Sequence, residues 1–112
     1  MKAPDFSLPD QDGTQHQLQD FAGRWLVLYF YPEDETGGCT TEACNFRDGR
    51  DVLVEFNKAA VVGVSPDSVE SHKKFAENHD LNFTLLSDPT HKTIEAYNSW
   101  DGQWTLRKKR ID

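Results

Sequence analysis

Residues 25–44 read WLVLYFYPEDETGGCTTEAC, and this stretch decides the fold. Its first seven residues are almost wholly apolar, which is typical of a strand buried on both faces in the middle of an α/β sheet. Pro32 stops the strand because proline has no backbone N–H to donate. Thr36-Gly37-Gly38 then makes a turn, and a segment of helical pattern opens at Cys39. The stretch therefore predicts a strand, a turn and a helix in immediate succession.

The two cysteines of the chain, Cys39 and Cys44, both follow this strand. A thiol at a helix N-terminus faces unpaired backbone N–H groups and the positive end of the helix dipole, and both favour thiolate over thiol. We therefore expect Cys39 to be a nucleophile and Cys44 to be a second thiol that receives its oxidation. The alternative is a pair of buried thiols that happen to share a helix.

The spacing of the two cysteines sets a condition on any disulfide between them. On an intact α-helix, residues five apart have Cα atoms roughly 8–9 Å from each other. A disulfide tolerates no more than about 7 Å. Oxidation of Cys39 and Cys44 to a disulfide must therefore unwind at least the first turn, so the spacing implies a helix with a closed and an open state.

The residues around the turn have two interpretations each. The Thr36 hydroxyl can bond to the thiolate or to an oxygen substrate, or it can cap the helix, and both can hold. Pro32 can shield the thiolate from water, or it can simply end the strand. Gly37 and Gly38 can let backbone N–H groups approach an oxyanion, or they can merely permit the turn.

The rest of the chain continues the alternation of strands and helices. The pattern predicts a β-hairpin near residues 6–18 that turns at Asp12-Gly13, a helix from Thr41 to about Lys58, and a buried strand at Ala60–Val64. A helix at Ser68–His79, begun by Asp or Ser caps, and a short strand at Thr84–Leu86 are expected next. The last expected helix contains Ile94 and Tyr97, and Asp88-Pro89 begins it. Alternating strands and helices imply parallel crossovers, hence an α/β sandwich.

Length and charge limit the classes of function. The chain has 112 residues and no internal repeat, so we expect one domain over residues 1–112. Nineteen acidic against twelve basic residues give a formal charge of -7, which argues against nucleic acid or an anionic membrane as a partner. We interpret the basic run Arg107–Arg110 as a solvated tail.

The N-terminus and the cysteine count indicate a compartment. Residues 1–5 have no apolar leader segment, and no stretch of the chain is long and apolar enough to span a membrane, so we expect a cytoplasmic protein. In that reducing compartment, two lone cysteines point to catalysis or redox sensing. The four histidines show no tight ligand spacing among themselves or with the cysteines, so no metal is expected.

The spacing Pro32-x-x-x-Thr36-x-x-Cys39 resembles the active-site signature of the peroxiredoxins, and residues 39–44 resemble their bacterioferritin comigratory protein (peroxiredoxin Q) subgroup. The likeness covers about residues 3–100, including residues 3–13, 28–32, 63–68 and 85–88. It implies a thioredoxin-like fold with an N-terminal β-hairpin, and reduction of hydrogen peroxide and organic hydroperoxides with thioredoxin or a similar dithiol as the donor.

The resemblance also implies a mechanism and a site. Cys39 thiolate attacks the peroxide and becomes a sulfenic acid, and Cys44 condenses with it to an intramolecular disulfide. Thr36 and Pro32 complete the catalytic residues. No metal, haem or flavin is required, and the subgroup leads us to expect a monomer.

The chain departs from the family in two places. The subgroup usually has proline where Gly37 stands, so a looser turn is expected before Cys39. The family also has an arginine on a late strand, a further strand and a C-terminal helix, whereas this sequence ends at Asp112. Arg107 aligns with that arginine through Ile111-Asp112, and Arg110 is nearly as good a candidate.

The shortened end predicts an open edge on the strand at residues 25–31, which invites pairing with another chain or aggregation. Residues 104–111 can instead fill the gap as a short substitute strand, or the sequence is a fragment of something longer.

Two other functions compete with a peroxidase. A thioredoxin-like disulfide oxidoreductase fits the fold but lacks a close Cys-x-x-Cys pair. A shortened, non-catalytic relative that senses oxidation or binds partners would fit the unassigned arginine and the aromatics Trp100 and Trp104. The sequence does not distinguish hydrogen peroxide from alkyl hydroperoxides.

Overall fold

The computed structural model describes residues 4–21, 24–55, 59–98 and 108–111. In chain order its elements are β1 (Ser7–Pro9), β2 (Gln15–Gln17), the 3-10 helix η1 (Leu18–Phe21), β3 (Arg24–Phe30), α1 (Gly37–Glu55), β4 (Ala59–Ser65), α2 (Val69–Asn78), β5 (Thr84–Ser87), α3 (Lys92–Asn98) and β6 (Lys108–Ile111). The predicted alternation of strands and helices is confirmed.

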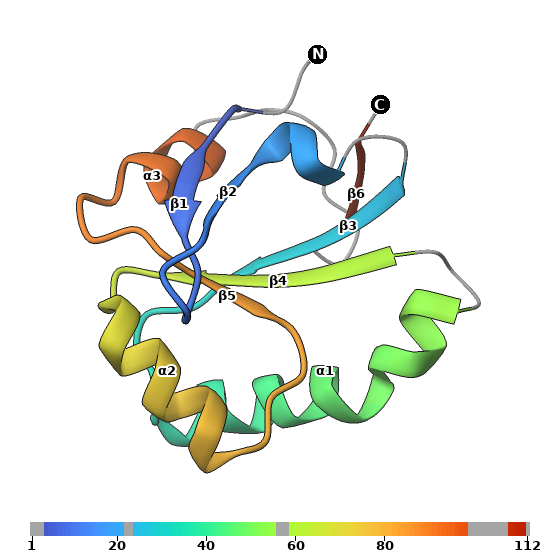
Figure 1. Ribbon diagram of the computed structural model, residues 1–112, viewed down its shortest axis with the longest axis vertical. Helices are drawn as coiled ribbons and strands as arrows, with labels where there is room; N and C mark the ends of the chain where they lie inside the picture. Colours follow the sequence, from blue (N-terminus) through green and yellow to red (C-terminus); the bar gives the residue numbers. More distant parts are fainter. Residues whose placement is uncertain (1–3, 22–23, 56–58, 99–107, 112) are drawn as a thin grey trace.

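A four-stranded sheet in the order β5-β4-β3-β6 forms the middle layer. Strands β3, β4 and β5 are parallel, and β6 runs antiparallel to β3. Helices α1 and α2 cover one face of the sheet, while α3 and the β1–β2 ribbon cover the other (Figure 1). This is the α/β sandwich that the sequence predicts, with the carboxyl ends of β3 and β4 at the same edge.

Strand β3 is buried on both faces, as its continuous apolar sequence predicts. Leu26 and Leu28 contribute to a core under α3 and the β1–β2 ribbon, together with Phe6, Leu8, Leu18, Phe21, Val62, Val64, Leu86 and Tyr97. Val27 and Tyr29 point the opposite way, into a core under α1 and α2 with Tyr31, Ala43, Val61, Phe75, Phe83 and Leu85. Because side chains alternate along a strand, one apolar run supplies both cores.

Two helix starts differ from the sequence prediction. Helix α1 begins at Gly37 rather than near Thr41, because the backbone N–H of Thr40 already donates to the carbonyl of Thr36 at 2.8 Å. Helix α3 begins at Lys92, so Pro89 is not its first residue. Asp88 nevertheless caps α3, since its carboxylate accepts from the backbone N–H of Ile94 at 2.9 Å. Ser68, by contrast, caps α2 as predicted, accepting from the N–H of Ser71.

The basic run near the C-terminus is not wholly a solvated tail. Lys108–Ile111 form β6, which pairs with Arg24–Val27 of β3. The expectation of a substitute strand is thus confirmed for these residues, and the open edge is wrong for the first half of β3. The backbone N–H and C=O groups at the edge of β3 can form hydrogen bonds with any extended segment, so a basic segment can pair with β3 as well as an apolar one.

At the opposite edge of the sheet, the side chain of Gln11 pairs with β5. Its Nε2 donates to the carbonyl of Phe83 and its Oε1 accepts from the N–H of Leu85, both at 3.0 Å. Gln11 lies in the turn of the β1–β2 ribbon, which Asp10 holds by accepting from the N–H groups of Asp12 and Thr14. The ribbon is thereby fixed to the edge of the sheet.

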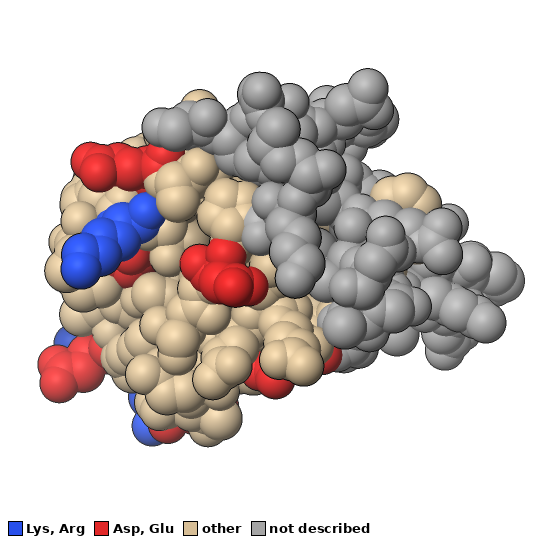
Figure 2. Space-filling model, turned by 90° about the horizontal axis from the view of Figure 1, so that it is seen from above, with Lys and Arg blue, Asp and Glu red and all other residues tan. Residues whose placement is uncertain are grey.

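The described surface agrees with the acidic composition. Seen from above, acidic and basic side chains are scattered among neutral ones over the described part of that face (Figure 2). None of the helices in the described part of the chain has both the length and the hydropathy that crossing a bilayer requires.

Candidate functional site

Cys39 lies where the sequence places it, in the first turn of the helix that follows the central strand. Strand β3 ends at Phe30, and α1 begins at Gly37, so Cys39 is the third residue of α1. Its side chain is partly buried and packs against the core under α1 and α2. The thiol thus combines a helix N-terminus with partial access to solvent, the environment of a reactive cysteine.

Cys44 is a second free, partly buried thiol on the same helix. The helix is continuous across both cysteines. This is the reduced arrangement that the five-residue spacing predicts, in which the two sulfurs cannot bond until the first turn opens.

An open groove of about 430 Å³ lies along one side of α1, and neither cysteine is among its lining residues. Gly38, Thr41, Glu42, Asn45 and Phe46 of α1 line it. The start of α1 is therefore accessible to a small molecule or to a partner protein.

Thr36 and Pro32 lie in the segment that joins β3 to α1. The Thr36 hydroxyl donates to the carbonyl of Glu33 at 3.2 Å, which is a long hydrogen bond. This hydrogen bond therefore runs back along the segment, not forward to the helix N–H groups that a capping role would need. Pro32 is exposed and lies two residues after Phe30, the last residue of β3.

Arg110, the candidate arginine that the structure describes, has its backbone far from Cys39. Arg110 pairs with Trp25 at the amino end of β3. At about 3.3 Å per residue, that point is roughly 16 Å along the strand from Phe30, beyond which Cys39 lies. Arg107, together with Trp100 and Trp104, lies outside the described residues.

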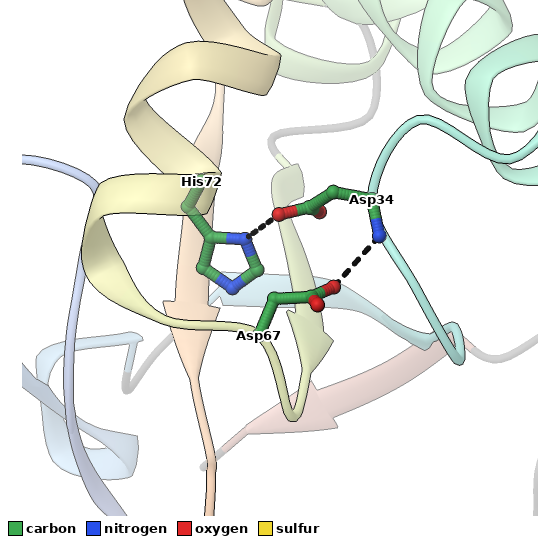
Figure 3. A group of neighbouring side chains, drawn as sticks. All are labelled: Asp34, Asp67 and His72. Atoms are coloured by element: carbon green, nitrogen blue, oxygen red, sulfur yellow. Dashed lines mark hydrogen bonds and ion pairs between the residues drawn. The ribbon is translucent and has the colours of Figure 1, made fainter.

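A buried polar cluster beside the segment was not predicted. His72 of α2 has no exposed surface, and Asp34, between β3 and α1, is 6% exposed. His72 Nδ1 lies 2.7 Å from Asp34 Oδ2, and Tyr31 donates its hydroxyl to Asp34 Oδ1 at 2.6 Å. Asp67, after β4, accepts from the backbone N–H of Asp34 at 2.7 Å (Figure 3).

One signal in the sequence could have revealed this cluster. His72 stands three residues before Phe75 and three after Val69, so it lies on the side of the predicted helix that faces the core. A polar residue on a core-facing position needs buried partners. The sequence does not say which residues those partners are, because Asp34 is 38 residues away.

Electrostatics within the cluster favour an ionised Asp34. Burial alone would raise the pKa of Asp34, but hydrogen bonds from His72, Tyr31 and Ser71 and the nearby charge of His72 lower it below its ordinary value. Burial, followed by the hydrogen bond to Asp34 and its charge, raises the pKa of Tyr31 far above its ordinary range. The carboxylate is therefore the negative centre, and the phenol stays a donor.

The same three residues, Asp34, Asp67 and His72, are close enough to be considered as metal ligands, since their ligand atoms lie within 4.8 Å of one another. Each candidate atom of the carboxylates already accepts a hydrogen bond, from the His72 ring, the Asp34 N–H or the Ser65 hydroxyl. The arrangement fits a hydrogen-bonded cluster rather than a cation site.

Comparison with known proteins places these residues in context. The family model described as AhpC/TSA matches residues 1–111. The chain is 52% identical over 99 residues to the peroxiredoxin Bcp of Bacillus subtilis, and 50% identical over 112 residues to that of Escherichia coli. These matches cover 88% and 98% of this chain, but only 62% and 69% of the two relatives.

A solved structure of the Xanthomonas campestris bacterioferritin comigratory protein, studied for its alkyl peroxide reduction activity, is also similar. It superposes with a TM-score of 0.79 at 39% identity, over 83% of this chain and 59% of that one. The likeness confirms the thioredoxin-like peroxiredoxin fold. The chain thus spans about six-tenths of the length of that protein and of the Bacillus relative.

Proposed function

Because the chain belongs to the AhpC/TSA family, in its Bcp and peroxiredoxin Q branch, we propose that it is a thiol-dependent peroxidase for hydrogen peroxide and organic hydroperoxides. The observation that carries the proposal is Cys39, a free, partly buried thiol in the first turn of α1 with a second free thiol on the same helix. A thiolate held at that position is a good nucleophile for an O–O bond.

The first step oxidises Cys39. Its thiolate attacks one peroxide oxygen, an S–O bond forms, the O–O bond breaks, and water or an alcohol leaves after taking a proton. Cys39 becomes a sulfenic acid, and the peroxide is reduced by two electrons.

The second step transfers the oxidation to Cys44. The Cys44 thiolate attacks the sulfenic sulfur, an S–S bond forms as the S–O bond breaks, and the leaving hydroxide takes up a proton to become water. Because the intact helix keeps the two residues too far apart, the first turn of α1 opens for this step. A dithiol, thioredoxin or a similar protein, then reduces the disulfide, and the helix closes again.

Thr36 and Pro32 are proposed to support the first step. The long hydrogen bond from Thr36 to Glu33 is weak enough to be exchanged for one to the peroxide or to the thiolate. Pro32 contributes a rigid backbone with no N–H of its own. We further propose that residues 1–112 act as one domain, as a monomer in the cytosol.

One experiment tests nucleophile, partner thiol and stoichiometry together. The reduced protein is mixed with one equivalent of hydrogen peroxide in a stopped-flow instrument, and the product is analysed by intact mass and peptide mapping. We expect rapid loss of one equivalent and a disulfide between Cys39 and Cys44, visible as the loss of two hydrogens.

Two matched variants separate the roles of the thiols. Cys44→Ser should still react quickly but stop at the sulfenic acid of Cys39, whereas Cys39→Ser should react no faster than free cysteine. A wild-type rate no faster than free cysteine would reject the peroxidase and leave a redox-sensing or partner-binding relative as the function.

A further inference from the structure

We propose that His72 is a positioning residue for Cys39, acting with Asp34 to fix the segment 31–36 that leads from β3 into α1. The proposal rests on the peroxidase function proposed above, because its effect is on the reactivity of Cys39. Neither residue touches the reacting atoms. Buried contacts join this segment to α2, β4 and β5, and Figure 3 shows those among Asp34, Asp67 and His72.

The contacts of the His72 ring determine its protonation. Nε2 lies 3.0 Å from the carbonyl of Leu86, and a carbonyl can only accept, so Nε2 carries a hydrogen. Nδ1 lies 2.7 Å from Asp34 Oδ2, which also accepts from the Ser71 hydroxyl at 2.8 Å. With Tyr31 donating to the other oxygen, Asp34 accepts on both sides as a carboxylate. Nδ1 therefore also carries a hydrogen, and His72 is an imidazolium.

This ion pair is shielded from water on every side that the structure describes. The side chains of His72 and Asp34 are 0% and 2% exposed. The titratable groups that face the ring are Asp34 and Tyr31 from the segment and Asp67 from the β4–α2 turn, and β5 supplies only its backbone carbonyl. A charged hydrogen bond in such surroundings is much stronger than one in water.

The pair holds the segment at defined points. Asp34 is bound through its side chain to α2 and through its backbone N–H to Asp67, which the Ser65 hydroxyl orients at 2.9 Å. Tyr31 is bound through its own N–H to the carbonyl of Val64 at 3.0 Å. Helix α1 begins three residues after Asp34, so these contacts set where its first turn starts relative to the sheet.

A second set of contacts, between Glu35 of the same segment and α2 with the residue after it, is exposed to solvent. Glu35 accepts from Asn78 at 2.7 Å and lies 2.5 Å from His79 Nε2, but its side chain is 45% exposed. Exposed ion pairs contribute little to the stability of a structure because water and salt screen the attraction between their charges. The buried pair is therefore the one that positions the segment.

The test compares rates of Cys39 oxidation by hydrogen peroxide among variants that are folded at the assay temperature. His72→Ala leaves Asp34 buried without its partner, and we expect the rate to fall roughly ten-fold or more, since a misplacement of about 1 Å can cost about 100-fold in a reaction. His91→Ala is the matched control, because His91 is an exposed histidine at the start of α3, and its rate should equal that of the wild type.

A second pair of variants separates positioning from general damage and serves if His72→Ala does not fold. In Asp34→Asn, the new amide can donate to a neutral His72, keep Tyr31 as donor to its oxygen and leave Nε2 bonded to Leu86, but it lacks the charge of the carboxylate, so the rate should fall less than in Asp34→Ala. Asp34→Ala removes these contacts and should be as slow as His72→Ala. Equal rates for Asp34→Asn and Asp34→Ala would overturn the proposal.

Nitrogen NMR of the His72 ring gives a readout independent of activity. At pH 7 both ring nitrogens of the wild type should be protonated, and a bare ring nitrogen would overturn the assignment. A fast wild type with an equally fast His72→Ala would overturn the positioning role alone, whereas a wild type no faster than free cysteine would overturn the proposed peroxidase as well.

Discussion

Among the glycines that the structure describes, Gly63 of β4 is the one where an added Cβ would meet neighbouring atoms. A Cβ at this position would lie 2.8 Å from the Cζ and hydroxyl of Tyr29 and 3.0 Å from its Cε1. Tyr29 cannot easily move aside, because its ring stacks on Phe46 of α1 with centroids 4.6 Å apart and on Tyr31 at 5.5 Å. The absent side chain at Gly63 thus makes room for the ring on which α1 packs.

Gly63→Ala should therefore lower the free energy of unfolding by about 1–3 kcal/mol, the usual cost of overpacking a core. Gly49→Ala is the matched control, since nothing lies within 4 Å of its added Cβ and alanine favours the interior of α1. That variant should gain about 0.5–1 kcal/mol. Urea denaturation of both variants measures the difference, and equal changes would contradict the packing argument.

The depressed pKa of Asp34 makes the stability of the fold depend on pH. Because the folded pKa lies below the ordinary value of 3.8, the folded state binds this proton less tightly than the unfolded chain does. The contribution of Asp34 is complete above about pH 5 and is lost as the pH falls through the folded pKa.

Comparison with Asp34→Asn isolates this effect, because the amide does not titrate. Below about pH 5, the difference in free energy of unfolding between wild type and variant should shift against the wild type as the pH falls through the folded pKa of Asp34. Denaturant titrations at each pH measure it, with other carboxylates such as Asp10 common to both proteins. A pH-independent difference would show that Asp34 is not the ionised partner of His72.

At the scale of elements, α1 carries both cysteines and must change shape in the proposed cycle. Its first residue, Gly37, stands where the subgroup usually has proline. Gly37 has no left-handed φ, and no described atom lies within 4 Å of an added Cβ. Proline is favoured at the first position of a helix, where no N–H is needed for helical bonding.

Gly37→Pro should consequently stabilise the closed helix by about 0.4–1 kcal/mol, because proline restricts the open form more than the closed one. We expect the Cys39–Cys44 disulfide to form more slowly after peroxide treatment, while oxidation of Cys39 itself keeps its rate. Quenched-flow mass spectrometry separates the two steps. Gly37→Ala controls for loss of the glycine, and faster disulfide formation in Gly37→Pro would contradict the opening of α1.

Strand β6 supports the first half of β3 through backbone pairing. Lys109→Pro removes an N–H from this strand, and we expect faster amide exchange at Trp25–Val27 and more self-association in sedimentation experiments. Lys109→Ala keeps the backbone and should behave as the wild type. Unchanged exchange in Lys109→Pro would mean that β6 does not protect β3 in solution.

Across the whole molecule, the sequence predicted what depends on local pattern. The uninterrupted apolar run of β3, the alternation of elements and the cap at Ser68 are all encoded within a few residues, and the position of Cys39 follows from them. The cluster around His72 depends instead on contacts between residues 31–34, 65–67, 71–72 and 86, which only the folded sheet brings together. The start of α3 was also missed, because Asp88 reaches its capping contact with Ile94 across five intervening residues.

The Gln11 side chain has a consequence for the lifetime of the protein. Its amide occupies, with one donor and one acceptor, the place that a neighbouring peptide group would take along β5. Hydrolysis of that amide to a carboxylate would remove the donor and set a negative charge against the carbonyl oxygen of Phe83. Slow deamidation at this one turn would then loosen the β1–β2 ribbon and leave the edge of β5 open to pairing with another chain.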